Sequence, residues 1–180
     1  MSRPALFLDR DGVINVDHGY VYKPDQFDFI EGIFELVVAA NRAGYLTIVV
    51  TNQAGIGRGY YTEADFHQVT EWMCSQFAMR GAQIDAVYYC PSHPEHGIGK
   101  YRKDDDCRKP APGMLLQAQN ELDIDLKRSV LVGDKLSDIQ AGKRAGVGIL
   151  IYYGDESGTV SSIRISRLSQ VVPYLVPFKI

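Results

Sequence analysis

A short run of apolar residues near the start of the chain ends abruptly in two acids. The run, Ala-Leu-Phe-Leu at residues 5–8, is followed by Asp9, Arg10, Asp11 and Gly12. A short apolar run bounded by turn residues is typical of a fully buried parallel strand, and its carboxyl end is where open α/β sheets bind ligands. Side chains alternate along an extended chain, so Asp9 and Asp11 point to the same side and repel each other, which favours a bound divalent cation. The alternative is a strand followed by an Asp-Gly turn with solvated acids.

The rest of the chain alternates between short β-branched runs and segments with helical spacing. This alternation predicts βαβ units around a central parallel sheet, a Rossmann-like three-layer α/β fold. We expect one domain over residues 1–180, with a loop insertion at about 90–112 that is rich in proline and charge. Strands are predicted at 46–50, 84–89, 129–132 and 148–152, helices at 32–42, 62–79, 113–122 and 137–145, and a further strand and short helix at 162–165 and 168–174.

Composition narrows the class of protein. A net charge of −3 gives no reason to expect general affinity for nucleic acid, and no segment reaches the 18 or more apolar residues of a membrane span. The amino terminus does not resemble a signal peptide, so we expect a cytoplasmic protein. The three cysteines argue for reduced thiols or a metal rather than a disulfide framework. Basic residues concentrate in the predicted loops, which favours a small anionic ligand over a scatter of solvated charges: Lys23, Arg58, Arg102, Lys103, Arg108, Lys109 and Lys135.

Polar residues follow the predicted strands and should meet at one edge of the sheet. Each has a simpler interpretation alone: Thr51 as a turn residue, Lys109 as a solvated lysine, Asp134 as an acid at a helix N-terminus. Their joint occurrence after successive strands favours a site that holds Mg²⁺ and a phosphoryl group. The set comprises Asp9 and Asp11, then Thr51, Asn52 and Gln53, then Lys109, and then Gly133, Asp134, Lys135 and Asp138.

Four segments resemble the motifs of the haloacid dehalogenase superfamily of phosphatases, and the match spans roughly residues 5–150. They are Leu-Asp-Arg-Asp-Gly, Val-Thr-Asn-Gln, Arg-Lys-Pro and Val-Gly-Asp-Lys-Leu-Ser-Asp. The resemblance implies a capless phosphatase in which Asp9 is the nucleophile and Asp11 the general acid and base. It also implies that Mg²⁺ is held by Asp9, the Asp11 backbone carbonyl and Asp134, and that Thr51 and Lys109 stabilise the phosphoryl group.

Within the superfamily the chain is similar to the D-glycero-D-manno-heptose 1,7-bisphosphate phosphatases and the related histidinol-phosphate phosphatases. The ending Arg58-Gly59 favours the heptose enzymes, since Arg58 and Arg108 suit a second phosphate. The implied substrate contacts are Asp17, His18, Gly19, Tyr20, Thr51, Asn52, Gln53, Ala54, Arg58, Arg108, Lys109 and Lys135.

The resemblance implies removal of the 7-phosphate from a heptose 1,7-bisphosphate, in nucleotide-heptose synthesis for bacterial lipopolysaccharide or capsule. It leaves the anomer and the pathway open. The alternatives are a histidinol-phosphate phosphatase and a non-catalytic phosphosugar-binding domain. The lack of a large cap predicts a monomer, and the net charge of −3 gives no reason to expect a nucleic-acid or membrane partner.

The third loop departs from these families, which carry a structural zinc on three cysteines and one histidine. The matching positions here are Cys90, Ser92, Asp105 and Cys107, so only two expected ligands are present. His93 or Asp105 could complete a weaker set with Cys90 and Cys107, and we therefore expect no zinc. Prolines, Tyr101 and ion pairs of Arg102 or Lys103 with residues 104–106 would then hold the loop. Tyr60, Tyr61, Tyr88 and Tyr89 are interpreted as packing residues rather than a sugar platform.

Overall fold

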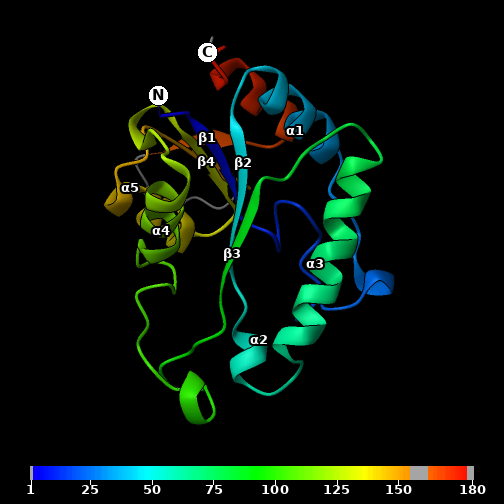
Figure 1. Cartoon of the computed structure of the whole chain (residues 1–180), viewed down its shortest axis with the longest axis vertical. Coiled ribbons are helices and arrows are strands. Elements are labelled where there is room, and N and C mark those ends of the chain that lie inside the picture. The colour runs from blue at the N-terminus through cyan, green and yellow to red at the C-terminus, as the bar shows by residue number, and fades with distance from the viewer. Residues whose placement is uncertain (1, 155–161, 178–180) are drawn as a thin grey trace.

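The computed structural model describes residues 2–154 and 162–177 and contains a parallel sheet flanked by helices (Figure 1). The six strands lie in the order β3-β2-β1-β4-β5-β6, and every neighbouring pair is parallel. This order is that of a Rossmann-like sheet, which confirms the predicted fold class. The strands are β1 Ala5–Leu8, β2 Leu46–Asn52, β3 Ala86–Cys90, β4 Val130–Gly133, β5 Ile149–Tyr153 and β6 Ile163–Ile165.

Helices cover both faces of the sheet because the buried strands are apolar on both sides. In β1, Leu6 and Leu8 face the core under α1 (Ile33–Arg42) and α3 (Glu63–Ala78). Ala5 and Phe7 face the core under α4 (Gly113–Leu122) and α5 (Leu136–Ala145). The remaining helices are α2 Ala54–Gly57 and the 3₁₀ helices η1 Pro24–Gln26, η2 Gly99–Tyr101, η3 Leu126–Arg128 and η4 Leu168–Tyr174.

Most predicted elements are present, several with ends shifted by a residue, and β2 continues to Asn52 rather than ending at residue 50. The third strand begins at Ala86 rather than at residue 84, because the Asp85 carboxylate accepts the Thr47 backbone N–H at 2.7 Å. The segment 168–174 is a 3₁₀ helix. The short α2 was not predicted, because its Ala-Gly-Ile-Gly sequence has the composition of a loop.

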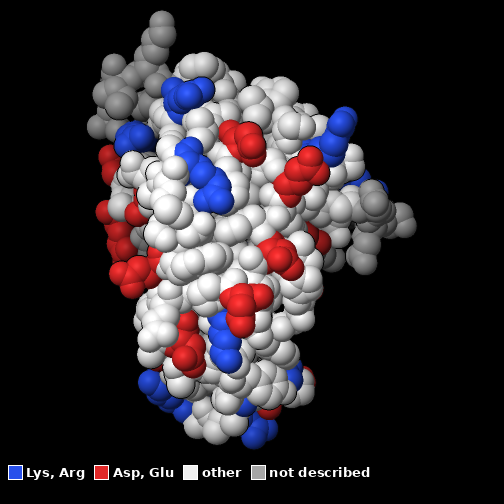
Figure 2. All heavy atoms as spheres, turned by 90° about the vertical axis from the view of Figure 1, so that its right-hand side faces the viewer, with Lys and Arg blue, Asp and Glu red and all other residues white. Residues whose placement is uncertain are grey.

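The carboxyl ends of the strands point toward the lower end of Figure 1, where α2 and the loop after β3 lie. On the face shown in Figure 2, several basic side chains gather at this same lower end, whereas acidic and basic side chains mix higher up. Among the described residues no separate domain covers this edge, as expected for a capless fold. None of the described helices is long and apolar enough to cross a membrane.

Candidate active site

The first polar residue after β1 is Asp9, which is almost completely buried at 6% exposure. Its Oδ1 accepts hydrogen bonds from the Arg10 backbone N–H at 2.8 Å and from Lys109 Nζ at 2.9 Å. The chain then turns at Gly12, which has a φ of 96°. A Cβ at this position would lie 2.0 Å from Oδ2 of Asp134, so glycine allows the loop to approach Asp134 closely.

Lys109 places a buried ammonium group between two carboxylates. Its Nζ lies 2.9 Å from Asp9 Oδ1, 2.6 Å from Asp138 Oδ1 and 2.8 Å from the carbonyl oxygen of Val50. Burial alone would lower the pKa of Lys109, but Asp9 and Asp138 outweigh burial and raise the pKa. The lysine therefore stays charged.

The backbone of Lys109 is fixed by Asn52 at the end of β2. The Asn52 side chain accepts the Lys109 N–H at 3.0 Å and donates to the Lys109 carbonyl oxygen at 3.0 Å. One side chain thus replaces a backbone partner for a residue in the long third loop. This reciprocal pair sets the position from which Lys109 reaches Asp9.

Three carboxylates from two strand ends form an acidic cluster beside Lys109. Oxygens of Asp9, Asp134 and Asp138 all lie within 4.8 Å of one another. Burial and then the neighbouring Asp138 raise the pKa of Asp9 well above its usual range, and the same two causes raise that of Asp134. Oδ1 of Asp134 is buried and has no hydrogen-bond partner. Mg²⁺ prefers oxygen ligands, so a buried cluster of carboxylates in which one oxygen accepts no hydrogen bond suits this ion.

Asp11 is held by three donors rather than by a lysine. Its Oδ1 accepts from Arg10 Nη2 at 2.8 Å and from Asn15 Nδ2 at 3.0 Å, and its Oδ2 accepts from Gln53 Nε2 at 3.0 Å. Arg10 is only 1% exposed and also donates to the carbonyl oxygen of Val21. No role was predicted for Arg10 or Asn15 from the sequence. The position of Arg10 between two acids could have indicated its role, because a charged side chain at the end of a buried strand needs partners.

A cleft of about 630 Å³ opens over these groups. Three predicted substrate contacts do not line the cleft: Thr51, which is fully buried, His18, whose ring pairs with Asp28 at 2.7 Å, and Arg58. Gly55, Tyr61, Pro110 and Ser137 line it without having been predicted as site residues, and Asp138, which was expected at this edge of the sheet, lines it too. The predicted residues that do line it are Asp9, Asp11, Asp17, Gly19, Tyr20, Asn52, Gln53, Ala54, Arg108, Lys109 and Lys135.

The cleft carries basic groups beyond Lys109. Nζ of Lys135 lies 3.2 Å from Oδ2 of Asp17. Burial alone would lower the pKa of Lys135, but the charges of Asp134 and Asp9 outweigh burial and raise this pKa. Burial and then the charge of Arg58 lower the pKa of Arg108. The two guanidinium groups are both positively charged and repel each other. An anion bound near Arg108 would relieve this repulsion.

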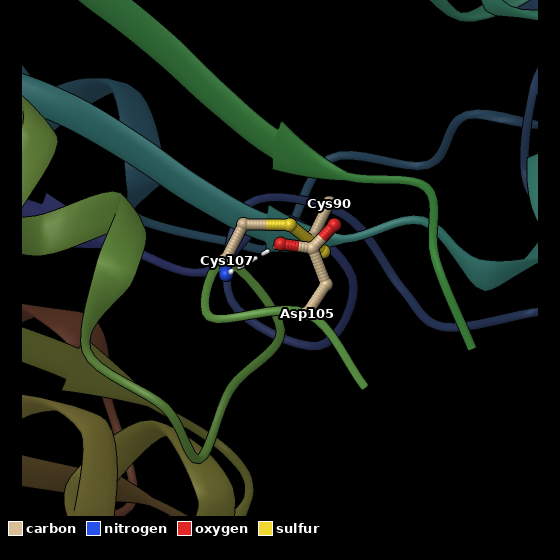
Figure 3. Close-up of side chains that lie close together, drawn as sticks. All are labelled: Cys90, Asp105 and Cys107. Atoms are coloured by element: carbon tan, nitrogen blue, oxygen red, sulfur yellow. Dashed lines mark hydrogen bonds between the residues drawn. A yellow bond between two sulfur atoms is a disulfide. The ribbon is translucent and has the colours of Figure 1, made fainter. Parts of the chain in front are cut away.

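The third loop contains a disulfide where the sequence predicted reduced thiols or a metal. Cys90 and Cys107 are bonded, with their Cα atoms 5.4 Å apart (Figure 3). The prediction of reduced thiols was therefore wrong for this pair, because the bond depends on a spatial proximity that sequence spacing does not reveal. The remaining cysteine, Cys74, is free.

The same loop does not offer a full zinc ligand set. Within residues 2–154 and 162–177, only Asp105 joins the two cysteines, with ligand atoms within 4.8 Å of one another, and the two sulfur atoms are bonded to each other. Nδ1 of His93 instead accepts backbone N–H groups of residues 95 and 96. These residues do not fit zinc, which needs free thiolates and a fourth ligand. The predicted local contacts are present: Lys103 lies 2.8 Å from Asp105, and the Tyr101 hydroxyl donates to Glu63 at 2.8 Å.

Comparison with known proteins matches this architecture. Residues 106–173 match a family model described as HAD-hydrolase-like. The chain is 55% identical to the D-glycero-alpha-D-manno-heptose-1,7-bisphosphate 7-phosphatase of Burkholderia mallei, over 97% of this chain and 95% of that protein. It is 49% identical to the D-glycero-beta-D-manno-heptose-1,7-bisphosphate 7-phosphatase of Vibrio cholerae, over 99% and 100%. The chain belongs to the HAD-like heptose-bisphosphate phosphatase family.

A solved structure from this family links the fold to a metal. The D,D-heptose 1,7-bisphosphate phosphatase of B. bronchiseptica was solved in complex with magnesium and phosphate. It superposes with a TM-score of 0.82 at 28% identity, covering 96% of this chain and 97% of that one. The family member therefore binds the two ligands that the acidic cluster and the basic cleft of this chain suit.

Proposed function

We propose that this chain is a Mg²⁺-dependent phosphatase that removes the 7-phosphate of D-glycero-D-manno-heptose 1,7-bisphosphate, in nucleotide-heptose synthesis. The observation that carries the proposal is the ion pair of Lys109 with Asp9 beside Asp134 and Asp138, under a cleft lined by Arg108 and Lys135. Phosphoryl transfer to a carboxylate requires a buried acid, a positively charged side chain beside it and a site for a metal ion. We also propose that the protein is cytoplasmic and monomeric, and that residues 1–180 form a single domain.

In the proposed reaction Asp9 attacks the phosphorus atom and Asp11 handles the proton. Lys109 neutralises charge on the phosphoryl oxygens, because a phosphate dianion otherwise repels an anionic nucleophile. Mg²⁺, when bound by Asp9, the Asp11 carbonyl oxygen and Asp134, supplies further positive charge at the transferring group. Asp11 gives a proton to the departing sugar oxygen as the P–O bond breaks, leaving an aspartyl phosphate on Asp9. It then takes a proton from the water that hydrolyses this intermediate.

The remaining predicted residues serve the substrate in this proposal. Arg108, with Arg58 behind it, holds the phosphate that does not react, because guanidinium groups offer paired donors to phosphate. Lys135, Asp17, Gly19 and Tyr20 line the same cleft and contact the sugar. Thr51 is fully buried and accepts a hydrogen bond from Gln53, and Asn52 acts through Lys109, whose backbone it holds.

The test is a kinetic comparison of phosphate esters by the purified protein with Mg²⁺. We expect the largest kcat/KM for one anomer of heptose 1,7-bisphosphate, with a product that keeps its 1-phosphate by ³¹P NMR. Relatives named for the alpha and the beta anomer are both about half identical to this chain, so both anomers are assayed. Faster turnover of histidinol phosphate, or no phosphate release from any ester, would contradict the proposal.

A further inference from the structure

The two oxygens of the Asp11 carboxylate have different surroundings. Oδ1 accepts two hydrogen bonds, from Arg10 and Asn15, which occupy both of its lone pairs in the carboxylate plane. Oδ2 accepts one, from Nε2 of Gln53, and so keeps one position open. Asp11 lines the cleft, and a group that exchanges a proton there needs a free position on one oxygen.

Gln53 has no hydrogen left for a substrate. Its Nε2 donates to Asp11 Oδ2 at 3.0 Å and to Thr51 Oγ1 at 2.8 Å, which commits both amide hydrogens. The side chain is 2% exposed although the residue lines the cleft. A role in holding Asp11 therefore fits Gln53 better than the substrate contact implied by resemblance.

Tyr61 determines which way the Gln53 amide faces. Its hydroxyl donates to Oε1 of Gln53. An amide turned over would place its oxygen against the Asp11 carboxylate, which can only accept when ionised. Burial raises the pKa of Tyr61, so the hydroxyl keeps the proton that it donates.

The ring of Tyr61 is itself held in place by packing. It is 6% exposed and stacks on Tyr22, with ring centroids 4.9 Å apart. Gly55 makes room for it, since a Cβ on Gly55 would lie 2.3 Å from the Tyr61 ring. The hydroxyl is thus presented to Gln53 from a rigid position.

We propose that Tyr61 and Gln53 are positioning residues for the acid–base step, which hold Asp11 so that Oδ2 is the oxygen that exchanges the proton. This inference rests on the proposed phosphatase function. In the first step the proton leaves Oδ2 for the sugar oxygen as that oxygen separates from phosphorus. In the second step Oδ2 takes a proton from water as the water oxygen bonds to the phosphorus of the aspartyl phosphate.

The variants Tyr61→Phe and Gln53→Glu remove the two hydrogen bonds separately. Tyr61→Phe keeps the ring and frees the amide, whereas Gln53→Glu keeps the shape and removes the donor to Asp11. The matched control is Tyr45→Phe, which deletes the hydroxyl of another buried tyrosine, at 4% exposure, just before β2 at the opposite end of the strand. Thermal unfolding of all three shows whether each variant folds.

The readout is the ratio of kcat/KM for two phosphate esters of different leaving groups. A sugar oxygen needs a proton to depart, whereas the nitrophenolate of p-nitrophenyl phosphate does not, and kcat/KM reports the step that transfers the phosphoryl group to Asp9. We expect Tyr61→Phe and Gln53→Glu to lower kcat/KM for the sugar phosphate by about tenfold or more and to change that for p-nitrophenyl phosphate by less than about twofold. Tyr45→Phe leaves both unchanged.

Three results overturn the inference. An equal loss for both esters in a folded variant indicates a general structural role, and no loss for either indicates no role. A rise in KM for the sugar phosphate with unchanged kcat indicates that Gln53 contacts substrate. The ratio can be measured with any sugar phosphate that the unmodified protein hydrolyses, so a different natural substrate leaves the test intact. An unmodified protein that hydrolyses neither ester instead refutes the phosphatase function itself, and the inference with it.

Discussion

The ammonium nitrogen of Lys109 lies 2.9 Å from Oδ1 of Asp9, although 100 residues separate the two along the chain. Both side chains are buried, and Lys109 also contacts Asp138 at 2.6 Å. A single cation therefore compensates two carboxylates that are almost completely buried at the base of the cleft. Such pairs contribute little net stability when complete, but an uncompensated buried charge is costly.

Replacement of this cation should destabilise the fold as well as abolish activity. We expect Lys109→Met to lower the free energy of unfolding by about 3–5 kcal/mol in urea titrations with EDTA, because Asp9 and Asp138 then repel each other without compensation. The double variant Lys109→Met/Asp138→Asn should regain part of this loss. Equal stability of the single variant and the unmodified protein would show that the ion pair does not hold these elements together.

Asp9→Asn separates chemistry from folding. The amide cannot form an aspartyl phosphate, so we expect phosphate release to fall at least about a thousandfold. Lys109 keeps Asp138 as a partner in this variant, so thermal unfolding should change little. The control is Asp123→Asn, the same change at an exposed position whose φ of 50° asparagine tolerates. Steady-state hydrolysis near the normal rate by Asp9→Asn would contradict the assignment of the nucleophile.

Arg108→Ala tests recognition of the phosphate that does not react. A lost hydrogen bond to a charged group costs about 1.5–3 kcal/mol, so KM for a sugar bisphosphate should rise about tenfold to a hundredfold. KM for a monophosphate of the same sugar should stay within about threefold. Arg42→Ala, at the exposed end of α1, removes the same charge away from the cleft. A parallel rise in KM for both esters would place Arg108 at the reacting phosphate instead.

The sequence contained enough to predict the sheet and the acids at its edge, and less about how those acids are held. Asp9 and Asp134 were predictable because each follows an apolar run, and the strand order brings such ends together. The reciprocal bonds between Asn52 and Lys109 were not, since they join a strand end to an irregular loop whose path has no periodic signal. The same applies to the Cys90–Cys107 bond, because it depends on where that loop returns.

Glu63 fastens this loop to α3 and should make stability depend on pH. Hydrogen bonds from the hydroxyls of Tyr101 and Tyr89, at 2.8 Å each, lower the pKa of Glu63 below its ordinary value of 4.5. The folded form therefore binds this proton less readily than the unfolded form. The resulting stabilisation is present above about pH 4.5 and is lost as pH falls through the lower pKa of the folded protein.

We expect Glu63→Gln to flatten this part of the acid limb in unfolding experiments between about pH 3 and pH 7. The control is Glu71→Gln, at an exposed position of the same helix. Because Glu63 is only partly buried and solvent screens its interactions, the expected difference is small, and the change in slope is the informative quantity. An acid limb that is identical for Glu63→Gln and the unmodified protein would show that the two tyrosines do not stabilise the carboxylate.

The disulfide between Cys90 and Cys107 should stabilise the protein by closing a loop with a sequence separation of 17 residues. Loop closure of this length restricts the unfolded chain and contributes about 3 kcal/mol, so reduction should lower the free energy of unfolding by that amount. Urea titrations with and without a reductant measure the difference, and peptide mapping without reductant identifies the linked segments. Cys74→Ser keeps the bond and should respond to reductant as the unmodified protein does, whereas Cys107→Ser should not respond. Two free thiols at positions 90 and 107 in protein purified without reductant, together with one equivalent of bound zinc, would show that this loop is braced by a metal after all.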